Sequence, residues 1–224
     1  VLLNGSALSV IWAADHVPAI LEAWYPGQAA GTAIADVLFG EVNPAGRLPV
    51  TFYRSVEQLP PFDDYAMRGR TYRYFTGEPL FPFGHGVSYT TFAYRDLRVP
   101  AQVRAGDTVR VTVEVENTGN RDGEEVVQLY VTDVEASVPV PIRTLVGFQR
   151  VALAPGERRT VTFAIAPRHL SVIDDAGTRV NEPGAFVVSV GGKQPGFSGV
   201  ADAPTTGVLM AGFNVVGDAT RLHR

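Results

Sequence analysis

The chain has 224 residues, of which 46% are hydrophobic, 19% charged and 10% aromatic, and it contains no cysteine. This composition excludes a disordered chain, a disulfide framework, a thiolate metal site and a cysteine nucleophile. The formal net charge is -4 and the arginines are scattered, which argues against a nucleic-acid partner because such a surface needs clustered positive charge. No apolar run approaches the roughly 20 residues of a membrane span, so we expect a soluble chain that does not enter a membrane.

The first 60 residues are predicted to form part of an α/β layer. Residues 1–3 and 19–24 are short apolar runs, typical of strands covered on both faces in a parallel sheet. A loop is expected between them, and apolar residues at helical spacing predict a helix from Ala30 to Leu38 that stops at Gly40. Two parallel strands do not make a stable sheet. The chain also opens in apolar sequence at Val1 without an initiator Met or a basic leader, which favours a fragment of a longer protein.

Residues 61–91 continue a stretch rich in Pro, Gly and aromatic residues that begins near residue 41. Pro and Gly at this density oppose regular secondary structure, while so many rings need a surface to cover them. We interpret this segment as a connector packed onto a larger body.

From residue 92 to residue 192 the hydrophobic period becomes 2. Val109, Val111, Val113 and Val115 alternate with polar residues, which predicts a half-buried antiparallel strand. Turn signals separate further strands, which are expected over residues 127–131, 144–151, 160–165, 170–173 and 185–190. About seven short strands in about 100 residues are typical of a β-sandwich of the immunoglobulin or fibronectin III type.

Residues 193–224 are interpreted as a C-terminal extension. Its apolar runs at 208–210 and 213–216 fit either one more edge strand or a strap over the sandwich. The predicted fold class is therefore α/β plus all-β: a partial α/β sandwich domain followed by a fibronectin III-like β-sandwich.

Paired carboxylates are the first candidates for acid and base chemistry. The pairs Asp63-Asp64, Glu124-Glu125 and Asp174-Asp175 are all expected to be solvated charges of loops, turns or the sandwich edge. Glu22 is less ordinary, because it lies near the end of a buried strand, where open α/β sheets place ligands. A structural hydrogen-bonding role is still favoured for it.

The four histidines, His16, His85, His169 and His223, show no metal-ligand spacing, so no metal site is expected. The tripeptide Gly84-His85-Gly86 resembles the start of a dinucleotide loop, but no strand precedes it and a tight turn is the better interpretation. Ser6 lacks the second glycine of a nucleophile elbow. No cofactor is therefore predicted.

An arginine-aromatic segment lies between residues 68 and 75. Its arginines and rings suit either sugar recognition or interdomain packing, and packing is favoured. The members of the segment are Arg68, Arg70, Tyr72, Arg73, Tyr74 and Phe75.

Several motifs in chain order resemble the C-terminal region of glycoside hydrolase family 3 and its fibronectin III-like domain. They are LEAWYPGQ at 21–28, ADVLFG at 35–40, NPAGRLP at 43–49, RTYRYF at 70–75, PLFPFGHGVSYT at 79–90, LVGFQRV at 145–151 and LAPGE at 153–157.

The resemblance implies a retaining exo-β-glycosidase of β-xylosidase or β-glucosidase type. The family's Asp nucleophile lies in an upstream barrel and its Glu acid/base precedes the strand that ends at Leu3, so neither maps onto this chain. Glu22 belongs to the WYPG motif and does not replace them. We expect no catalytic, cofactor or metal residue here, and the substrate-binding residues stay unknown. Expected partners are the upstream barrel and α/β domain of the same enzyme, through which the oligosaccharide would bind.

An alternative from another class stays open: a stand-alone carbohydrate- or protein-binding β-sandwich module, since fold alone does not decide function. For the hydrolase reading, a periplasmic or extracellular location is expected.

Overall fold

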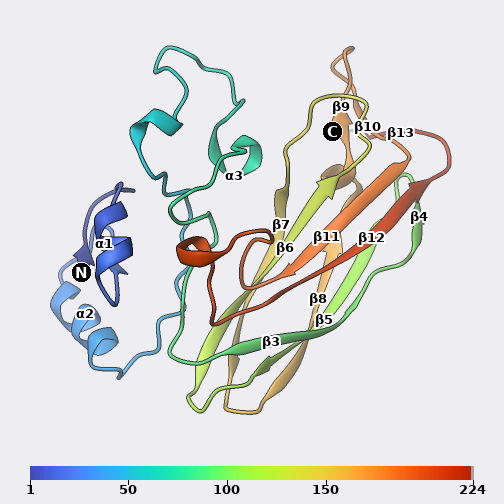
Figure 1. Ribbon diagram of the computed structural model, residues 1–224. Helices are drawn as coiled ribbons and strands as arrows, with labels where there is room; N and C mark the ends of the chain where they lie inside the picture. Colours follow the sequence, from blue (N-terminus) through green and yellow to red (C-terminus); the bar gives the residue numbers. More distant parts are fainter. Residues whose placement is uncertain (223–224) are drawn as a thin grey trace.

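A computed structural model describes residues 1–222, and the chain divides into two visibly different parts (Figure 1). Residues 92–222 form a β-sandwich, while residues 1–91 form a small α/β layer and a long, mostly irregular connector beside it. The predicted fold class is correct for both parts.

Two mainly antiparallel sheets make the sandwich, as expected for a fibronectin III-like domain. The first has the order β3-β5-β8 and the second the order β4-β12-β11-β6-β7. Their bounds are β3 Phe92–Arg98, β4 Gln102–Arg104, β5 Val109–Asn117, β6 Gly123–Asp133, β7 Thr144–Leu153, β8 Arg158–Ile165, β11 Gly184–Gly191 and β12 Val208–Val216.

The predicted register of the sandwich is confirmed. Val109, Val111, Val113 and Val115 of β5 are each 0% exposed and face the common core, while the residues between them face outward or are partly covered. Strand alternation has a period of two, so a shift by one residue would have turned all four valines into solvent.

The segment after residue 192 supplies a full strand of the sandwich. β12 pairs antiparallel with β11 along its length and parallel with β4, so it lies inside the five-stranded sheet and is neither an edge strand nor a strap. A smaller sheet of order β13-β10-β9 closes one end; its strands are β9 Val172–Ile173, β10 Arg179–Asn181 and β13 Thr220–Arg221.

One expected strand is shorter than predicted and follows a helical turn. Residues 170–173 were expected to be extended, but Pro167–Leu170 form a 3-10 helix and only Val172–Ile173 form a strand. Pro167 explains the difference, because its fixed φ suits the first position of a helix.

The N-terminal layer contains β1 (Leu2–Leu3) and β2 (Leu21–Glu22), which pair in parallel as a two-stranded sheet. Within residues 1–222 no other strand joins them. The helix α2 spans Ala30–Leu38 and ends before Gly40, whose φ of 80° is the left-handed conformation expected at a helix stop.

A second helix, α1 (Ile11–His16), occupies the segment expected to be a loop. Trp12 and His16 are four residues apart on it and stack with ring centroids 4.9 Å apart, and His16 Nδ1 lies 2.8 Å from the Trp12 carbonyl. With only six residues, α1 is too short to give a clear periodic signal. Neither α1 nor α2, nor any other helix over residues 1–222, is long and apolar enough to cross a membrane.

The connector is irregular, as predicted, with short helical turns only. These are η1 Val56–Gln58 and α3 Thr71–Tyr74, and a third turn, η3 Gly199–Ala201, lies in the later loop between β11 and β12. An isolated bridge pairs Phe52 with Phe81 and so joins the connector to the segment before it.

Candidate functional site

A candidate site in the described part of the chain is a cavity of about 360 Å³ between the N-terminal layer and the connector. Its wall is mainly apolar and includes the rings of Trp24, Phe52 and Phe81. Glu22, Arg47 and His85 are the charged or titratable residues that line it. An apolar cavity with a few polar groups is the usual form of a binding site.

Glu22 makes the structural hydrogen bond expected of it. Its Oε1 accepts from the backbone N–H of Trp24 at 2.7 Å, which holds Trp24 at a φ of 54°, a left-handed conformation that a bulky residue rarely adopts. Its Oε2 is buried and has no hydrogen-bond partner. Because Glu22 is the only carboxylate among the residues described in this wall, the cavity does not hold the carboxyl pair of a glycosidase.

His85 lies in a tight turn, as predicted: its backbone N–H donates to the Pro82 carbonyl at 3.1 Å. Burial lowers the pKa of the His85 imidazole to about 4, so the ring is neutral at pH 7. Its Nδ1 is buried without a partner, and its ring lies 5.1 Å from that of Phe81.

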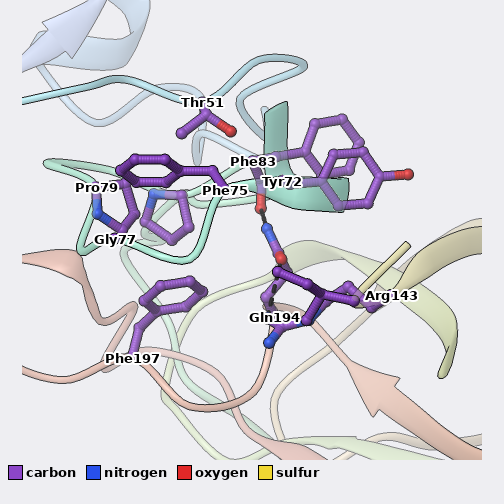
Figure 2. Close-up of a pocket in the computed structure, with 11 residues that line it drawn as sticks. Thr51, Tyr72, Phe75, Gly77, Pro79, Phe83, Arg143, Gln194 and Phe197 are labelled. Atoms are coloured by element: carbon purple, nitrogen blue, oxygen red, sulfur yellow. Dashed lines mark hydrogen bonds between the residues drawn. The ribbon is translucent and has the colours of Figure 1, made fainter. Parts of the chain in front are cut away.

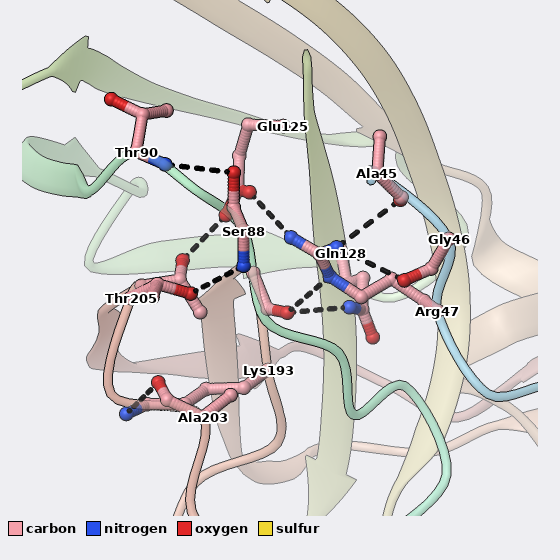
Figure 3. A network of polar contacts seen from close by, with 12 residues as sticks. Ala45, Gly46, Arg47, Ser88, Thr90, Glu125, Gln128, Lys193, Ala203 and Thr205 are labelled. Carbon is pink, nitrogen blue, oxygen red and sulfur yellow. Dashed lines mark hydrogen bonds and ion pairs between the residues drawn. The ribbon is translucent and has the colours of Figure 1, made fainter. Parts of the chain in front are cut away.

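A buried ion pair joins the cavity wall to the sandwich (Figure 3). Arg47 Nη2 lies 2.6 Å from Glu125 Oε2, and the two side chains are 6% and 0% exposed. Arg47 also donates to the carbonyls of Ala45 and Gly46 in its own loop and to Gly192 in the sandwich. One guanidinium group therefore fastens the NPAGRLP loop to β6 and to the end of β11.

Glu125 corrects the sequence prediction. Instead of being a solvated charge, it lies on the inner face of β6, where its Oε1 accepts hydrogen bonds from the hydroxyls of Tyr94 and Thr206. Burial raises the pKa of the Glu125 carboxyl, and Arg47 and the two hydroxyls oppose this rise. Its neighbour Glu124 does face solvent, where it pairs with Arg150 at 3.1 Å.

The ion pair of Arg47 and Glu125 is called the junction below. A network of uncharged hydrogen-bonding groups extends it. Gln128 Nε2 donates to the carbonyl of Gly84 at 3.1 Å and to that of Gly192 at 2.8 Å, and the hydroxyl of Tyr130 donates to Gln128 Oε1. The backbone comes so close here that a Cβ on Gly84 would overlap Gln128 Oε1. Gly84 has a φ of 79°, so both its conformation and its neighbours require glycine.

The second half of the arginine-aromatic segment packs against the sandwich, which is the interpretation favoured from sequence (Figure 2). Tyr72 stacks on Phe83 with centroids 4.2 Å apart, and its hydroxyl accepts a hydrogen bond from the Leu145 N–H. The Arg73 carbonyl accepts from the Ile142 N–H at 2.7 Å. The pocket beside these rings has a volume of about 30 Å³, which suits a water molecule and not a sugar.

The remaining candidates are not brought together. Asp63 and Asp64 are exposed, while Asp174 caps its own turn by accepting from Ala176 and Thr178. His16 and His169 are exposed on separate elements, and His223 lies outside the described residues. Within residues 1–222 no group of three or more metal-ligating side chains forms.

The chain thus consists of a β-sandwich that is fastened to an α/β layer. Known proteins have the same arrangement. Residues 1–89 match the family model described as the glycosyl hydrolase family 3 C-terminal domain, and residues 125–194 match the fibronectin type III-like domain. The chain belongs to the C-terminal region of glycoside hydrolase family 3.

Relatives and solved structures agree with this assignment. The chain is 45% identical to a β-xylosidase of Formosa agariphila and 43% identical to a periplasmic β-glucosidase of Salmonella typhimurium, and each match covers 85% of this chain and 27% of the relative. The structure of β-glucosidase 3B from Thermotoga neapolitana matches all of this chain and 32% of that one, with 35% identity and a TM-score of 0.86. The chain thus spans about a quarter of the length of the curated relatives that it matches.

Proposed function

We propose that this chain is the structural C-terminal part of a retaining exo-β-glycosidase that hydrolyses terminal non-reducing β-D-xylosyl or β-D-glucosyl residues. The proposal takes the two catalytic carboxylates to be upstream of Val1, as the family resemblance implies. It takes the chain to comprise an α/β part at 1–60, a connector at 61–91 and a sandwich that begins at residue 92 and includes β12 from the segment predicted to be an extension at 193–224.

The observation that carries the proposal is that the parallel sheet of the N-terminal layer has only two strands in the described part of the chain. A stable parallel sheet needs about three or more strands covered on both faces, and β1 and β2 have only each other within the described residues. Beside them lie a cavity of about 360 Å³ and many exposed apolar side chains, such as Trp12, Tyr25 and Phe39. We infer that the upstream α/β domain and barrel of the same enzyme cover this surface.

The chemistry of the cavity supports a structural role. A retaining glycosidase requires two carboxyl groups about 5–5.5 Å apart. Glu22 stands alone in the described cavity wall, and one of its oxygens is used to hold Trp24. The unpaired Oε2 of Glu22 suits a hydrogen-bond donor from the upstream domain.

In this proposal the sandwich supports the cavity wall through the junction. Arg47 and Glu125 tie the loop that forms the cavity wall to a rigid β-sheet. Catalytic groups must be held to within about an ångström, so loss of such a brace is expected to lower the activity of the whole enzyme by about 100-fold.

The binding of the substrate and the location of the enzyme are proposed from the similarity to family members. The oligosaccharide would bind through the upstream domains, and the name of the Salmonella relative favours the periplasm or the extracellular space.

The direct test is an assay of the pure 224-residue chain with aryl β-D-xyloside and aryl β-D-glucoside. We expect no sugar release, whereas replacing the matching C-terminal region of the Formosa β-xylosidase with this chain should leave that enzyme active. Turnover by the chain alone, which persists through further purification, would refute the structural role.

A further inference from the structure

We propose that His85 is the acid-sensitive part of a latch, which holds the N-terminal part of the chain on the sandwich at neutral pH and opens when the imidazole takes up a proton. The latch is the set of contacts that join residues 83–88 to residues 46–48 on one side and to the loop between β11 and β12, residues 192–207, on the other. This inference goes beyond the proposed function, because it adds a response to pH to a structural role.

The first side of the latch is a close contact between two stretches of backbone. The Leu48 N–H donates to the His85 carbonyl at 2.9 Å, and the Gly84 N–H donates to the Leu48 carbonyl at 2.7 Å. A Cβ on Gly86 would lie only 2.3 Å from the carbonyl oxygen of Gly46, so no free space separates the two stretches. A movement of His85 therefore disturbs the loop that carries one half of the junction.

The second side of the latch bonds the same segment to the sandwich. Gln194 Nε2 donates to the Phe83 carbonyl, and the Ser88 N–H donates to Thr205 Oγ1 at 3.1 Å. Both partners belong to the β11–β12 loop. Residues 83–88 are thus bonded to both parts of the chain, and their release would loosen the contact between the two parts.

The charged groups around the His85 ring come from several elements. Arg47 in the cavity wall and Lys193 in the β11–β12 loop are cations that oppose another positive charge, while Asp202 favours it. Lys193 Nζ lies 2.6 Å from Asp202 Oδ1, so this carboxylate already has a cationic partner. Glu22 of β2 faces the same cavity from the N-terminal layer. No carboxylate among these is left to pair with a charged His85 alone.

Protonation would also leave a buried donor without an acceptor. The Ala201 backbone is the hydrogen-bond partner of the His85 ring, while Nδ1 is buried and has no partner. A proton added at Nδ1 would therefore form an unsatisfied N–H in addition to a buried charge. Burial is the largest cause that lowers the pKa of His85 to about 4, and Arg47 and Lys193 act in the same direction.

The direction of the response follows from these two states of the ring. In the open latch the ring lies in water and takes up a proton near pH 6.5, whereas the closed latch takes it up only near the pKa of about 4. Acid therefore favours the open latch between these values. The equilibrium constant for opening should rise about 20-fold between pH 7 and pH 5.

Hydrogen exchange of the 224-residue chain at pH 7 and pH 5 tests the latch. The protection factors of the Leu48 and Gly84 amides, which donate the backbone bonds of the latch, should fall about 20-fold. At low concentrations of urea these factors should stay constant, because local opening exposes little surface, whereas the protection of Val113 in the sandwich core should fall steeply. The same urea dependence for all three amides would mean that the latch opens only when the chain unfolds, which would overturn the proposal.

Two histidine variants assign the response. His85→Gln does not take up the proton, so its latch amides should change by less than about threefold between pH 7 and pH 5. The matched control His169→Gln removes an exposed imidazole on the 3-10 helix and should keep the 20-fold loss. Glu125 of the junction is the other group that acid could neutralise, because burial raises its pKa. An undiminished loss in His85→Gln would assign the response to Glu125 and would overturn the proposal.

The ring of the unchanged chain decides the matter if His85→Gln itself leaves the latch open at pH 7. NMR titration of the carbon-bound protons of the ring should give His85 a pKa below about 5. A pKa of about 6 or higher would overturn the proposal. None of these measurements involves turnover, so their failure would leave the proposed function standing, and the aryl glycoside assay tests that function separately.

Discussion

Residues 92–222 bury their apolar side chains between sheets of the same chain, whereas residues 1–91 leave most of theirs in contact with solvent. The sandwich has a continuous core that runs from Phe92 to Val215. In the N-terminal part, Leu3, Ala45, Phe52 and Leu80 are the buried apolar residues. The two parts are similarly apolar. Their burial differs because the sandwich has a second sheet to cover its apolar face, whereas the N-terminal part has no such layer among the described residues.

The largest effect is expected in the sandwich core. Val113→Asp removes about 1.5–3 kcal/mol of apolar burial and places a carboxylate among apolar residues, so we expect a loss of at least about 4 kcal/mol in the free energy of unfolding. The matched control Val56→Asp changes a side chain that is 73% exposed, and should alter stability by no more than about 0.5 kcal/mol. Denaturant unfolding measures both, and equal midpoints would show that the assigned core is wrong.

Breaking the junction is expected to come next. Glu125→Ala leaves the Arg47 guanidinium buried without its partner, which costs about 3–5 kcal/mol. The double variant Arg47→Met/Glu125→Leu removes both charges and should be less destabilised than Glu125→Ala. Glu124→Ala is the control, because this exposed neighbour is worth no more than about 1 kcal/mol. Similar losses for the two glutamates would contradict a special role for Glu125.

The lowered pKa of His85 predicts how the stability of the folded chain changes as the pH falls. The pKa of His85 is about 4 in the folded chain against the ordinary 6.5, so the unfolded state takes up the proton first as the pH falls. Stability should therefore decline between about pH 6.5 and pH 4, by up to about 3 kcal/mol, and His85 contributes no such change above pH 6.5. Urea unfolding at several pH values should show a flatter decline for His85→Gln, while His169→Gln, on an exposed side chain, should keep most of the slope.

The smallest effect is expected on the open surface of the N-terminal part. Phe39→Ser replaces a ring that is 84% exposed and should change the stability of this chain by no more than about 0.5 kcal/mol. Phe52→Ser is the contrast, because Phe52 is 1% exposed between Trp24 and Phe81 and should cost about 3–5 kcal/mol. A large loss for Phe39→Ser would mean that the chain already covers this surface.

The elements that the sequence predicted correctly are those with a clear hydrophobic period among neighbouring residues. Alternation along β5 and the helical spacing of α2 each involve residues close in sequence, so both elements were located correctly. The same alternation continues from Val131 back through Val127 to Glu125, which was a usable sign that Glu125 faces inward. Its place in an acidic pair instead led to the wrong prediction that Glu125 is solvated.

Contacts between distant residues could not be predicted in this way. Arg47 and Glu125 are 78 positions apart, and nothing in their local sequence indicates that they meet. The position of β12 inside its sheet depends on pairing with β4, more than a hundred residues earlier. The short α1 is missed for another reason, because six residues are too few to show a helical period.

Native-state hydrogen exchange of the 224-residue chain tests most directly whether the N-terminal layer is open. The amides of Leu21 and Ala23, which join β2 to β1, should exchange at least about a hundredfold faster than those of Val113 and Leu129 in the sandwich core. Equal protection in the two regions would mean that β1 and β2 are already part of a closed, cooperative core, and the account of this chain as the brace of a larger glycosidase would be contradicted.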